Sequence, residues 1–323
     1  MDSVIVTIMN RELKVHGHFN GLKTTVLFAL MWAVIMLVWW FTGGRQGTLG
    51  LFIVIGLVTT FGSYWFSDKL AIASMRAREV SEQEAPVLYR VTRELSAAAG
   101  KPMPRIYIAP TMSPNAFATG RNERHAAVCC TQGILQMLNE REIRGVLGHE
   151  LMHVYNHDIL TSAIASAMST VITYLGYSMM YLGGGNSRDD RSNGGGLGLI
   201  GVLLSAILAP IGASLIQMAI SRTREYDADE DGSRLTRDPE ALASALNKIS
   251  TGAQANPMPQ TAGTQNVAAM MIANPFSVQG LSRLFSTHPP TDQRIARLMR
   301  MAQEMQQSDV DAGSRYSQVG YQD

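Results

Sequence analysis

The stretch HELMHVYNHD, residues 149–158, indicates the fold of the soluble part of this protein. Within it His149 and His153 lie four positions apart, so on a helix both imidazoles project from one face and can share one zinc ion. Glu150 lies beside them, where it can take a proton from water. The pattern therefore predicts a helix that carries two zinc ligands and a general base.

A zinc ion that catalyses hydrolysis needs a third protein ligand and one open position. His157 continues the spacing, but on a straight helix it lies about 12 Å along the axis from His149. We therefore expect His157 at the surface or behind the ligands. Glu225 and Asp229 are one helical turn apart, which suits one carboxylate to bind zinc and the other to hold an imidazole by its free N–H. A solvated acidic face is the alternative interpretation of this pair.

Four stretches of the chain carry no Asp, Glu, Lys, Arg or His and are long enough to cross a bilayer: residues 24–42, 48–66, 159–182 and 197–220. Even a 19-residue helix is roughly 28 Å long, close to the thickness of the hydrocarbon core. The sequence therefore predicts an integral membrane protein with two helical hairpins. For the second hairpin, which is rich in Ser and Thr, a buried or membrane-dipping helix pair is the alternative.

Basic residues flank the first hairpin asymmetrically. Six lie outside the hairpin and one in its connecting loop: Arg11, Lys14, Lys23, Lys69, Arg76 and Arg78 against Arg45. By the positive-inside rule both ends of this hairpin face the cytoplasm. The second hairpin begins six residues after His153 and ends five residues before Glu225. If it crosses the membrane twice, both ligand-bearing segments emerge together on the cytoplasmic side.

The remaining segments predict a mainly α-helical soluble part with a small β-sheet. Residues 105–109 and 126–130 are short β-prone runs with 115–120 between them, which suggests about three strands. Helices are expected at 86–100, from Asn139, where Glu142 completes a capping pattern, and from Asp238–Pro239. A loop is expected at 251–266, and a last amphipathic helix from Thr291.

Charge and cysteine content argue against a nucleic-acid-binding protein and against a fold held together by disulfides. The chain of 323 residues has 27 basic and 26 acidic side chains, with no long block of either sign, which argues against a nucleic-acid partner. Cys129 and Cys130 are adjacent, so a disulfide between them would strain the backbone. The sequence has no disulfide framework.

Four motifs in this order resemble the HtpX-type membrane zinc metalloproteases, relatives of the CAAX prenyl proteases. They are NAFATG at 115–120, HELMHVYNHD at 149–158, SRTREYDAD at 221–229 and THPPTDQRI at 287–295. The resemblance implies a zincin-like protease domain with one zinc ion per subunit. It implies His149, His153 and Glu225 as zinc ligands, Glu150 as the catalytic base and Asp229 as a supporting residue. Two positions depart from the family pattern, His157 where a small residue is expected and Asp227 where some members have His.

The resemblance also implies a function and a location. The expected function is hydrolysis of misfolded or damaged membrane proteins in quality control and stress response. The expected location is a bacterial inner membrane, with a multi-pass chain and the active site facing the cytoplasm. The expected partners are such substrates, the lipid bilayer and other membrane quality-control proteases.

These expectations divide the chain into six parts. They are a cytoplasmic N-terminal segment at 1–23, the first hairpin at 24–66, a first protease part at 67–158, the second hairpin at 159–220, a second protease part at 221–305 and a disordered tail at 306–323.

Substrate contacts can be predicted for two segments. Asn115, Ala116 and Phe117 could offer an exposed strand edge to which an extended peptide adds by backbone pairing, and an ordinary sheet core is the alternative. His288 is a candidate stabiliser of the transition state, with a Pro-rich structural corner as the alternative.

Three other functions compete with this prediction. A membrane adaptor with structural zinc would need a fourth protein ligand, and none is evident. A zinc transporter would need ionisable residues inside its spans, which the four stretches do not have. A prenyl-protein protease would process lipidated C-termini, and nothing in the sequence indicates such a substrate.

Overall fold

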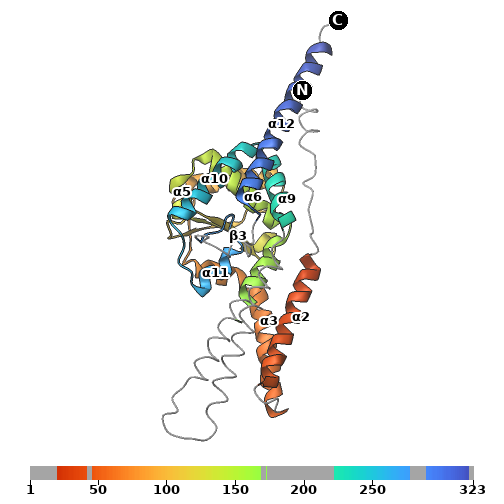
Figure 1. Ribbon diagram of the computed structural model, residues 1–323, viewed down its shortest axis with the longest axis vertical. Coiled ribbons are helices and arrows are strands. Elements are labelled where there is room, and N and C mark those ends of the chain that lie inside the picture. Colours follow the sequence, from red (N-terminus) through yellow and green to blue (C-terminus); the bar gives the residue numbers. More distant parts are fainter. Residues whose placement is uncertain (1–19, 42–45, 169–171, 173–221, 277–288, 320–323) are drawn as a thin grey trace.

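A computed structural model describes residues 20–41, 46–168, 172, 222–276 and 289–319. In it a rounded body of helices and strands carries two long helices on one side and a third that leaves on the opposite side (Figure 1). Most of the predicted segment 1–23, most of the predicted second hairpin and His288 lie outside the described residues.

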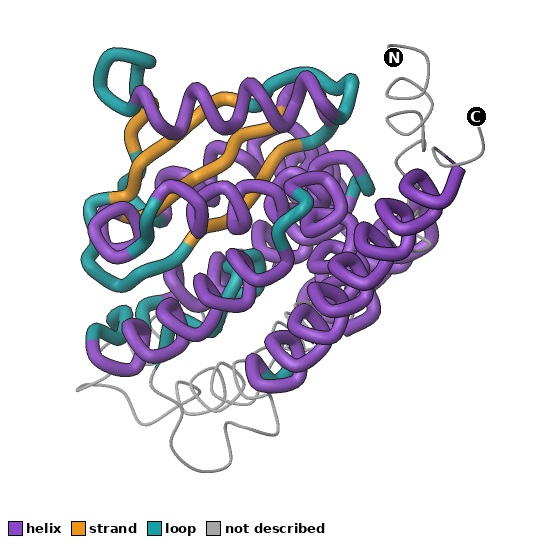
Figure 2. Tube along the Cα trace, turned by 90° about the horizontal axis from the view of Figure 1, so that it is seen from above, coloured by secondary structure: helices purple, strands orange, loops and turns teal. Residues whose placement is uncertain are grey.

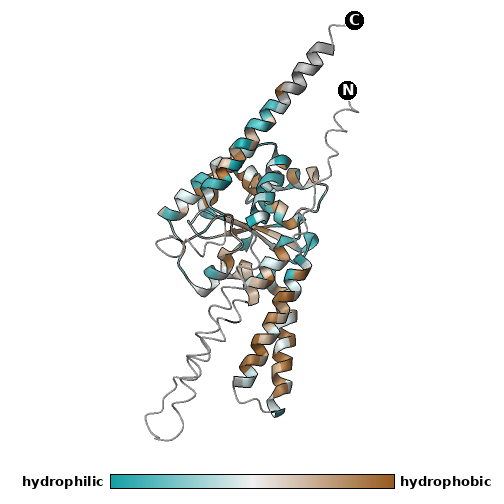
Figure 3. Cartoon of the chain, turned by 45° about the vertical axis from the view of Figure 1, so that its right-hand side comes forward, coloured by the Kyte–Doolittle hydropathy of each residue, from teal (hydrophilic) through white to brown (hydrophobic). Residues whose placement is uncertain are grey.

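The two long helices are α2, Asn20–Phe41, and α3, Gln46–Ser74. Both are long and apolar enough to cross a membrane, judged by length and composition. Figure 3 shows them as the most hydrophobic part of the molecule. Large apolar side chains on α3 remain exposed, among them Leu51, Val58, Phe61 and Trp65. An apolar surface of this size on a monomer indicates contact with lipid or with another protein.

Helix α3 continues eight residues beyond the apolar stretch that predicted it. The continuation is possible because Asp68, which is 6% exposed, forms an ion pair with Arg105 at 3.2 Å. The charged turn therefore packs on the soluble body and joins the hairpin to it.

A short apolar helix, Asp158–Met168, lies at the start of the predicted second hairpin. Its residues Ile164 and Met168 pack against Leu27 and Met31 of α2 in one buried cluster. The first hairpin is thus in direct contact with the chain that follows the HELMH motif.

The sheet has four strands, one more than expected. They are β1, Arg78–Glu79, β2, Arg105–Ala109, β3, Ala116–Gly120, and β4, Ala126–Thr131. The strand order is β1-β2-β4-β3, with β2 and β4 parallel and the outer pairs antiparallel. Strand β1 has only two residues, both exposed, so it has no alternating pattern by which the sequence could predict it.

Helices lie on both sides of this sheet (Figure 2). They are α4, Pro86–Ala98, α5, Gln132–Met137, α6, Glu140–Tyr155, α9, Arg222–Thr236, α10, Pro239–Ala255, α11, Ala262–Ala268, and α12, Thr291–Val319. The predicted starts at Pro86, Asn139, Asp238 and Thr291 agree with the structure.

The prediction of a loop at 251–266 is wrong, and a helix extends into the segment predicted as a disordered tail. The expected loop at 251–266 contains the last turn of α10 and most of α11, whose first turn is closed by a capping box from Thr261 and Thr264. The expected disordered tail begins inside α12, which continues to Val319. Its first turns pack on α10, and good helix formers such as Met, Gln and Glu follow, so the helix propagates outward from an anchored end.

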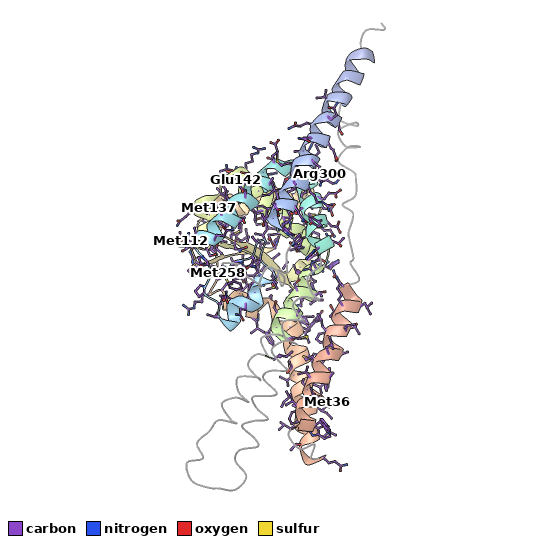
Figure 4. The ribbon with its side chains drawn as sticks, in the orientation of Figure 1. Met36, Met112, Met137, Glu142, Met258 and Arg300 are labelled. Carbon is purple, nitrogen blue, oxygen red and sulfur yellow. The ribbon has the colours of Figure 1, made fainter. Side chains whose placement is uncertain are left out.

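Helix α6 is the central element of the body. Asn139 caps it, and Glu142 returns the bond to the Asn139 backbone, as the sequence predicts. Figure 4 labels Glu142 on the rounded body, away from the two long helices. Its carboxylate also accepts hydrogen bonds from Ser244 and Lys248 of α10, at 2.7 and 2.8 Å. From Val146 onward every residue of α6 is buried. The HELMH motif therefore lies inside the protein, on a helix that is fixed at its start.

Helices α6 and α9 cross at two glycines. A Cβ atom added to Gly232 of α9 would lie 2.8 Å from the backbone nitrogen of His149, and one added to Gly148 would lie 3.1 Å from the Gly232 carbonyl oxygen. Side chains at these positions would separate the two helices. The glycines therefore allow α9 to bring its carboxylates to the histidines.

Candidate metal centre

Three predicted ligands from two helices converge at the crossing of α6 and α9. The Nε2 atoms of His149 and His153 lie 3.2 Å apart. The carboxylate oxygens of Glu225 lie 3.8 Å from His149 Nε2 and 3.5 Å from His153 Nε2. All three residues are buried or nearly so, with 0%, 9% and 3% of their surfaces exposed. Segments far apart in the sequence thus meet as the sequence predicted.

The separations fit a tetrahedral zinc ion. Ligand atoms at about 2.0–2.1 Å from such an ion lie about 3.3 Å from one another. Burial is the main cause that lowers the pKa of His149, to about 4, so its ring is neutral at pH 7, as a ligand must be. Two imidazole nitrogens and one carboxylate are a donor set that zinc accepts. The residues present therefore fit the metal.

Asp229 lies behind His149, as predicted. Its Oδ1 is 3.0 Å from His149 Nδ1. Arg294 of α12 donates two hydrogen bonds to the same carboxylate, from Nε at 2.8 Å and from a terminal nitrogen at 2.6 Å. Burial alone would raise the pKa of Asp229, but the charge and hydrogen bonds of Arg294 outweigh it and lower the pKa. A fully ionised carboxylate is therefore held against the first histidine.

Asp158 lies behind His153. The sequence analysis gave Asp158 no role. Its Oδ2 is 3.2 Å from His153 Nδ1, and the residue is 1% exposed. Burial alone would lower the pKa of His153, but the negative charges of Glu225 and Asp158 raise it. Each histidine thus has a carboxylate on the nitrogen that faces away from the ligand position, an arrangement that sets the tautomer and orientation of zinc-binding imidazoles.

Glu150 is completely buried next to the two histidines. Among the described residues, no side chain donates a hydrogen bond to its carboxylate. Burial is the main cause that raises its pKa to about 7, and the negative charge of Glu225 raises it further. A carboxylate with a pKa near neutrality can both take and return a proton. Glu150 has the properties of the predicted base.

The strand edge at Asn115–Phe117 is not exposed, which corrects the prediction. Strand β3 is at the edge of the sheet, but Ala116 and Phe117 are 0% exposed because residues 269–273 cover them. Phe117 forms an antiparallel bridge with Met271, and the Ile272 N–H donates to the Ala116 carbonyl at 2.9 Å. We call residues 269–273 the covering segment. It pairs with the edge of β3 where the sequence analysis expected a substrate to pair.

The covering segment also narrows the space beside the metal ligands. A cavity of about 10 Å³ lies there, and its lining includes Ala118, His153, Glu225, Ala269 and Met270. This volume accommodates about one water molecule. Among the described residues this cavity is too small for a peptide, so part of its lining would have to move for one to enter.

The remaining predicted positions lie outside the ligand group. His157 is exposed, in a left-handed turn with φ of 59°, and its Nε2 lies 3.8 Å from a carboxylate oxygen of Glu123. Asp227 is half-buried on α9 and is not among the three converging ligands. The prediction that His157 does not bind zinc agrees with this position.

Comparison with known proteins agrees with this geometry. The family model for Peptidase family M48 matches residues 82–302, which include both ligand-bearing helices. The chain belongs to peptidase family M48. The chain is 80% identical over 305 residues to "Protease HtpX homolog" of Bifidobacterium longum, covering 94% of this chain and 99% of that protein. It is 58% identical over 290 residues to the protein of the same name in Pseudarthrobacter chlorophenolicus, covering 89% and 98%.

A solved structure is also similar. The crystal structure of S. mikatae Ste24p aligns with a TM-score of 0.43 and 19% sequence identity, and the match covers 85% of this chain and 63% of that one.

M48 membership shows that this chain is a metallopeptidase, and with α2 and α3 it is a membrane-associated one. The family implies a bound metal, usually zinc, and the group of His149, His153 and Glu225 fits that metal. An adaptor or a transporter does not account for the match to a peptidase family.

Proposed function

We propose that this protein is a zinc-dependent endopeptidase that hydrolyses misfolded or damaged membrane proteins on the cytoplasmic side of a bacterial inner membrane, as part of protein quality control and stress response. The observation that carries the chemistry is the buried Glu150, with a pKa near 7, beside three converging ligands.

In this mechanism His149, His153 and Glu225 hold the metal. When bound, zinc polarises the peptide carbonyl and makes water more acidic. Glu150 takes a proton from the attacking water and then delivers a proton to the leaving amine. Asp229 and Asp158 keep the two imidazoles in the tautomer that leaves Nε2 free to bind. His288 remains a proposed stabiliser of the transition state.

The contact between the first hairpin and the metal centre supports membrane-embedded substrates. Asn20, the first residue of α2, is hydrogen-bonded to Asp158, the residue behind His153. Asp158 therefore connects the proposed site to helix α2, which is long and apolar enough to cross the bilayer. A protein segment that protrudes from the membrane would reach the site without travelling far. The flanking basic residues support the cytoplasmic orientation.

Substrate binding on β3 requires the covering segment to leave. An extended peptide would then pair with Ala116 and Ala118 in the place of the covering segment and lie next to Glu150. Because such pairing uses backbone groups, it tolerates many substrate sequences, which suits a quality-control protease.

The chemistry is tested with the detergent-purified full chain and its Glu150→Gln variant. We expect one zinc per chain in both and casein cleavage only in the parent. Glu140→Gln is the matched control, because Glu140 is exposed in the first turn of the same helix and pairs with Arg90. Full activity of Glu150→Gln would refute the assignment of the base. Cleavage of a prenylated peptide in preference to an unfolded membrane protein would refute the substrate class.

The covering segment is tested with a cysteine pair. Ala118→Cys and Met270→Cys would face one another if the Phe117–Met271 pairing continues by one residue, and both positions line the small cavity. We expect the oxidised pair to block cleavage and a reducing agent to restore it, while each single variant stays active in both conditions. Full activity of the oxidised pair would show that substrate binds elsewhere.

A further inference from the structure

Asp158 lies where three parts of the chain meet. It begins the helix Asp158–Met168, which two residues separate from the end of α6, and its Oδ2 is 3.2 Å from His153 Nδ1. The side-chain amide of Asn20, on α2, donates to its other oxygen, Oδ1, at 2.9 Å. Arg224 of α9 approaches it, with Nε 3.6 Å from Oδ2. Each of these four residues is at least nine-tenths buried.

Asn20 also fixes the turn that brings Asp158 to the histidine. Its amide lies 3.3 Å from the carbonyl oxygens of both Asn156 and His157. His157 has a positive φ of 59°, a conformation that is unfavourable for a residue other than glycine unless its surroundings hold it. Asp158 accepts one of the two hydrogens of the Asn20 amide, and the two carbonyl groups of the turn share the other. The position of Asp158 therefore depends on a residue of the first apolar helix.

We propose that Asp158 and Asn20 are positioning residues of the metal centre, so that helix α2 is part of the zinc site as well as a membrane anchor. Asp158 accepts the Nδ1–H of His153 and leaves the Nε2 lone pair directed at the ligand position. Asn20 keeps the Asp158 carboxylate in the orientation that makes this bond. The inference rests on the proposed zinc-binding role of His153.

The experiment measures zinc affinity of the full chain in detergent, by competition with a chromophoric chelator, so it does not depend on cleavage. For Asp158→Asn we expect a loss of about 10–100-fold, the usual effect of removing a residue that orients a zinc ligand. For Asn20→Ala, which acts one hydrogen bond further away, we expect a loss of about 3–10-fold.

Thr24→Ala is the matched control. Thr24 is on the next turn of α2 and its hydroxyl is 3.2 Å from that of Thr161, so the substitution removes a contact between the same two helices without touching Asp158. We expect its zinc affinity to match that of the parent. If Asn20 only held the helices together, both substitutions would lower the melting temperature of the metal-free protein equally and neither would change zinc affinity.

Two further readouts separate positioning from general loosening. Cobalt substituted for zinc should show a changed visible spectrum in Asn20→Ala and the parental spectrum in Thr24→Ala. In the Asp158→Asn background, Asn20→Ala should have no further effect on zinc affinity, because the two residues act through one bond. Parental zinc affinity of Asn20→Ala would overturn the inference, and so would an equal loss in Thr24→Ala. Failure of casein cleavage together with the expected zinc affinities would count against the proposed function alone.

Discussion

Gly232→Ala should displace the metal ligands by a predictable amount. The added Cβ would lie 2.8 Å from the backbone nitrogen of His149, whereas an ordinary contact begins at about 3.5 Å, so α9 must move by about 0.7 Å. Zinc–ligand distances tolerate only about 0.2 Å. Because α9 carries Glu225, we expect zinc affinity to fall by at least about tenfold.

The substitution also changes the stability of the metal-free protein. Overpacking costs about 1–3 kcal/mol, and alanine regains up to about 1 kcal/mol of helix propensity. The metal-free protein should therefore lose about 0–2 kcal/mol in its free energy of unfolding.

Gly145→Ala is the matched control for Gly232→Ala. A Cβ at Gly145 would lie 2.9 Å from the Leu242 nitrogen, so it overpacks α6 against α10 to a similar degree, away from the ligands. We expect comparable loss of stability but near-parental zinc affinity, by chelator competition and thermal unfolding of the metal-free forms. If both variants bound zinc like the parent, the close approach of α6 and α9 would not set the site geometry.

Two further substitutions test the surroundings of the site. Glu142→Gln should cost about 1 kcal/mol at pH 7, because it weakens the α6 cap and the bond from Lys248. Burial alone would raise the pKa of Glu142, but hydrogen bonds from Lys248, Ser244 and the Asn139 backbone lower it. This stabilisation is therefore present above about pH 4.5 and lost as the pH falls further. Thermal unfolding should show a smaller stability difference between parent and variant at pH 4 than at pH 7, and an unchanged difference would contradict the assignment. Arg294→Met should cost about 3–5 kcal/mol, because it leaves the buried Asp229 carboxylate without its partner; a loss below about 1 kcal/mol in denaturant unfolding would show that Asp229 is not held by Arg294.

The two histidine ligands could be predicted because their geometry is local, whereas Glu225 was chosen as the third ligand from the expected topology and the family resemblance. His149 and His153 follow from helical periodicity alone, and so does the pairing of Glu225 with Asp229. The helix start at Asn139 follows from a side chain that caps its own backbone. Such features depend on residues a few positions apart, which a sequence displays directly.

The supporting residues could not be predicted, because they depend on tertiary contacts. Asp158 is five positions after His153, a spacing that misses the ligand face of a straight helix, and it returns only through the left-handed turn at His157. Asn20 lies 138 positions from Asp158, and no local pattern connects them. Arg294 was quoted within THPPTDQRI but had no assigned role. The covering segment was missed because its pairing with β3 is a single long-range bridge.

The order in which the ligands are made has a consequence for biosynthesis. Glu225 follows His153 by 72 residues, so a growing chain that has just completed HELMH offers two of the three proposed ligands. At about 5–20 residues per second, a ribosome needs roughly 4–14 s to reach the third. During that interval the proposed metal site is incomplete. If Glu225 is the third ligand, a growing chain cannot cut neighbouring nascent chains before this residue has been made.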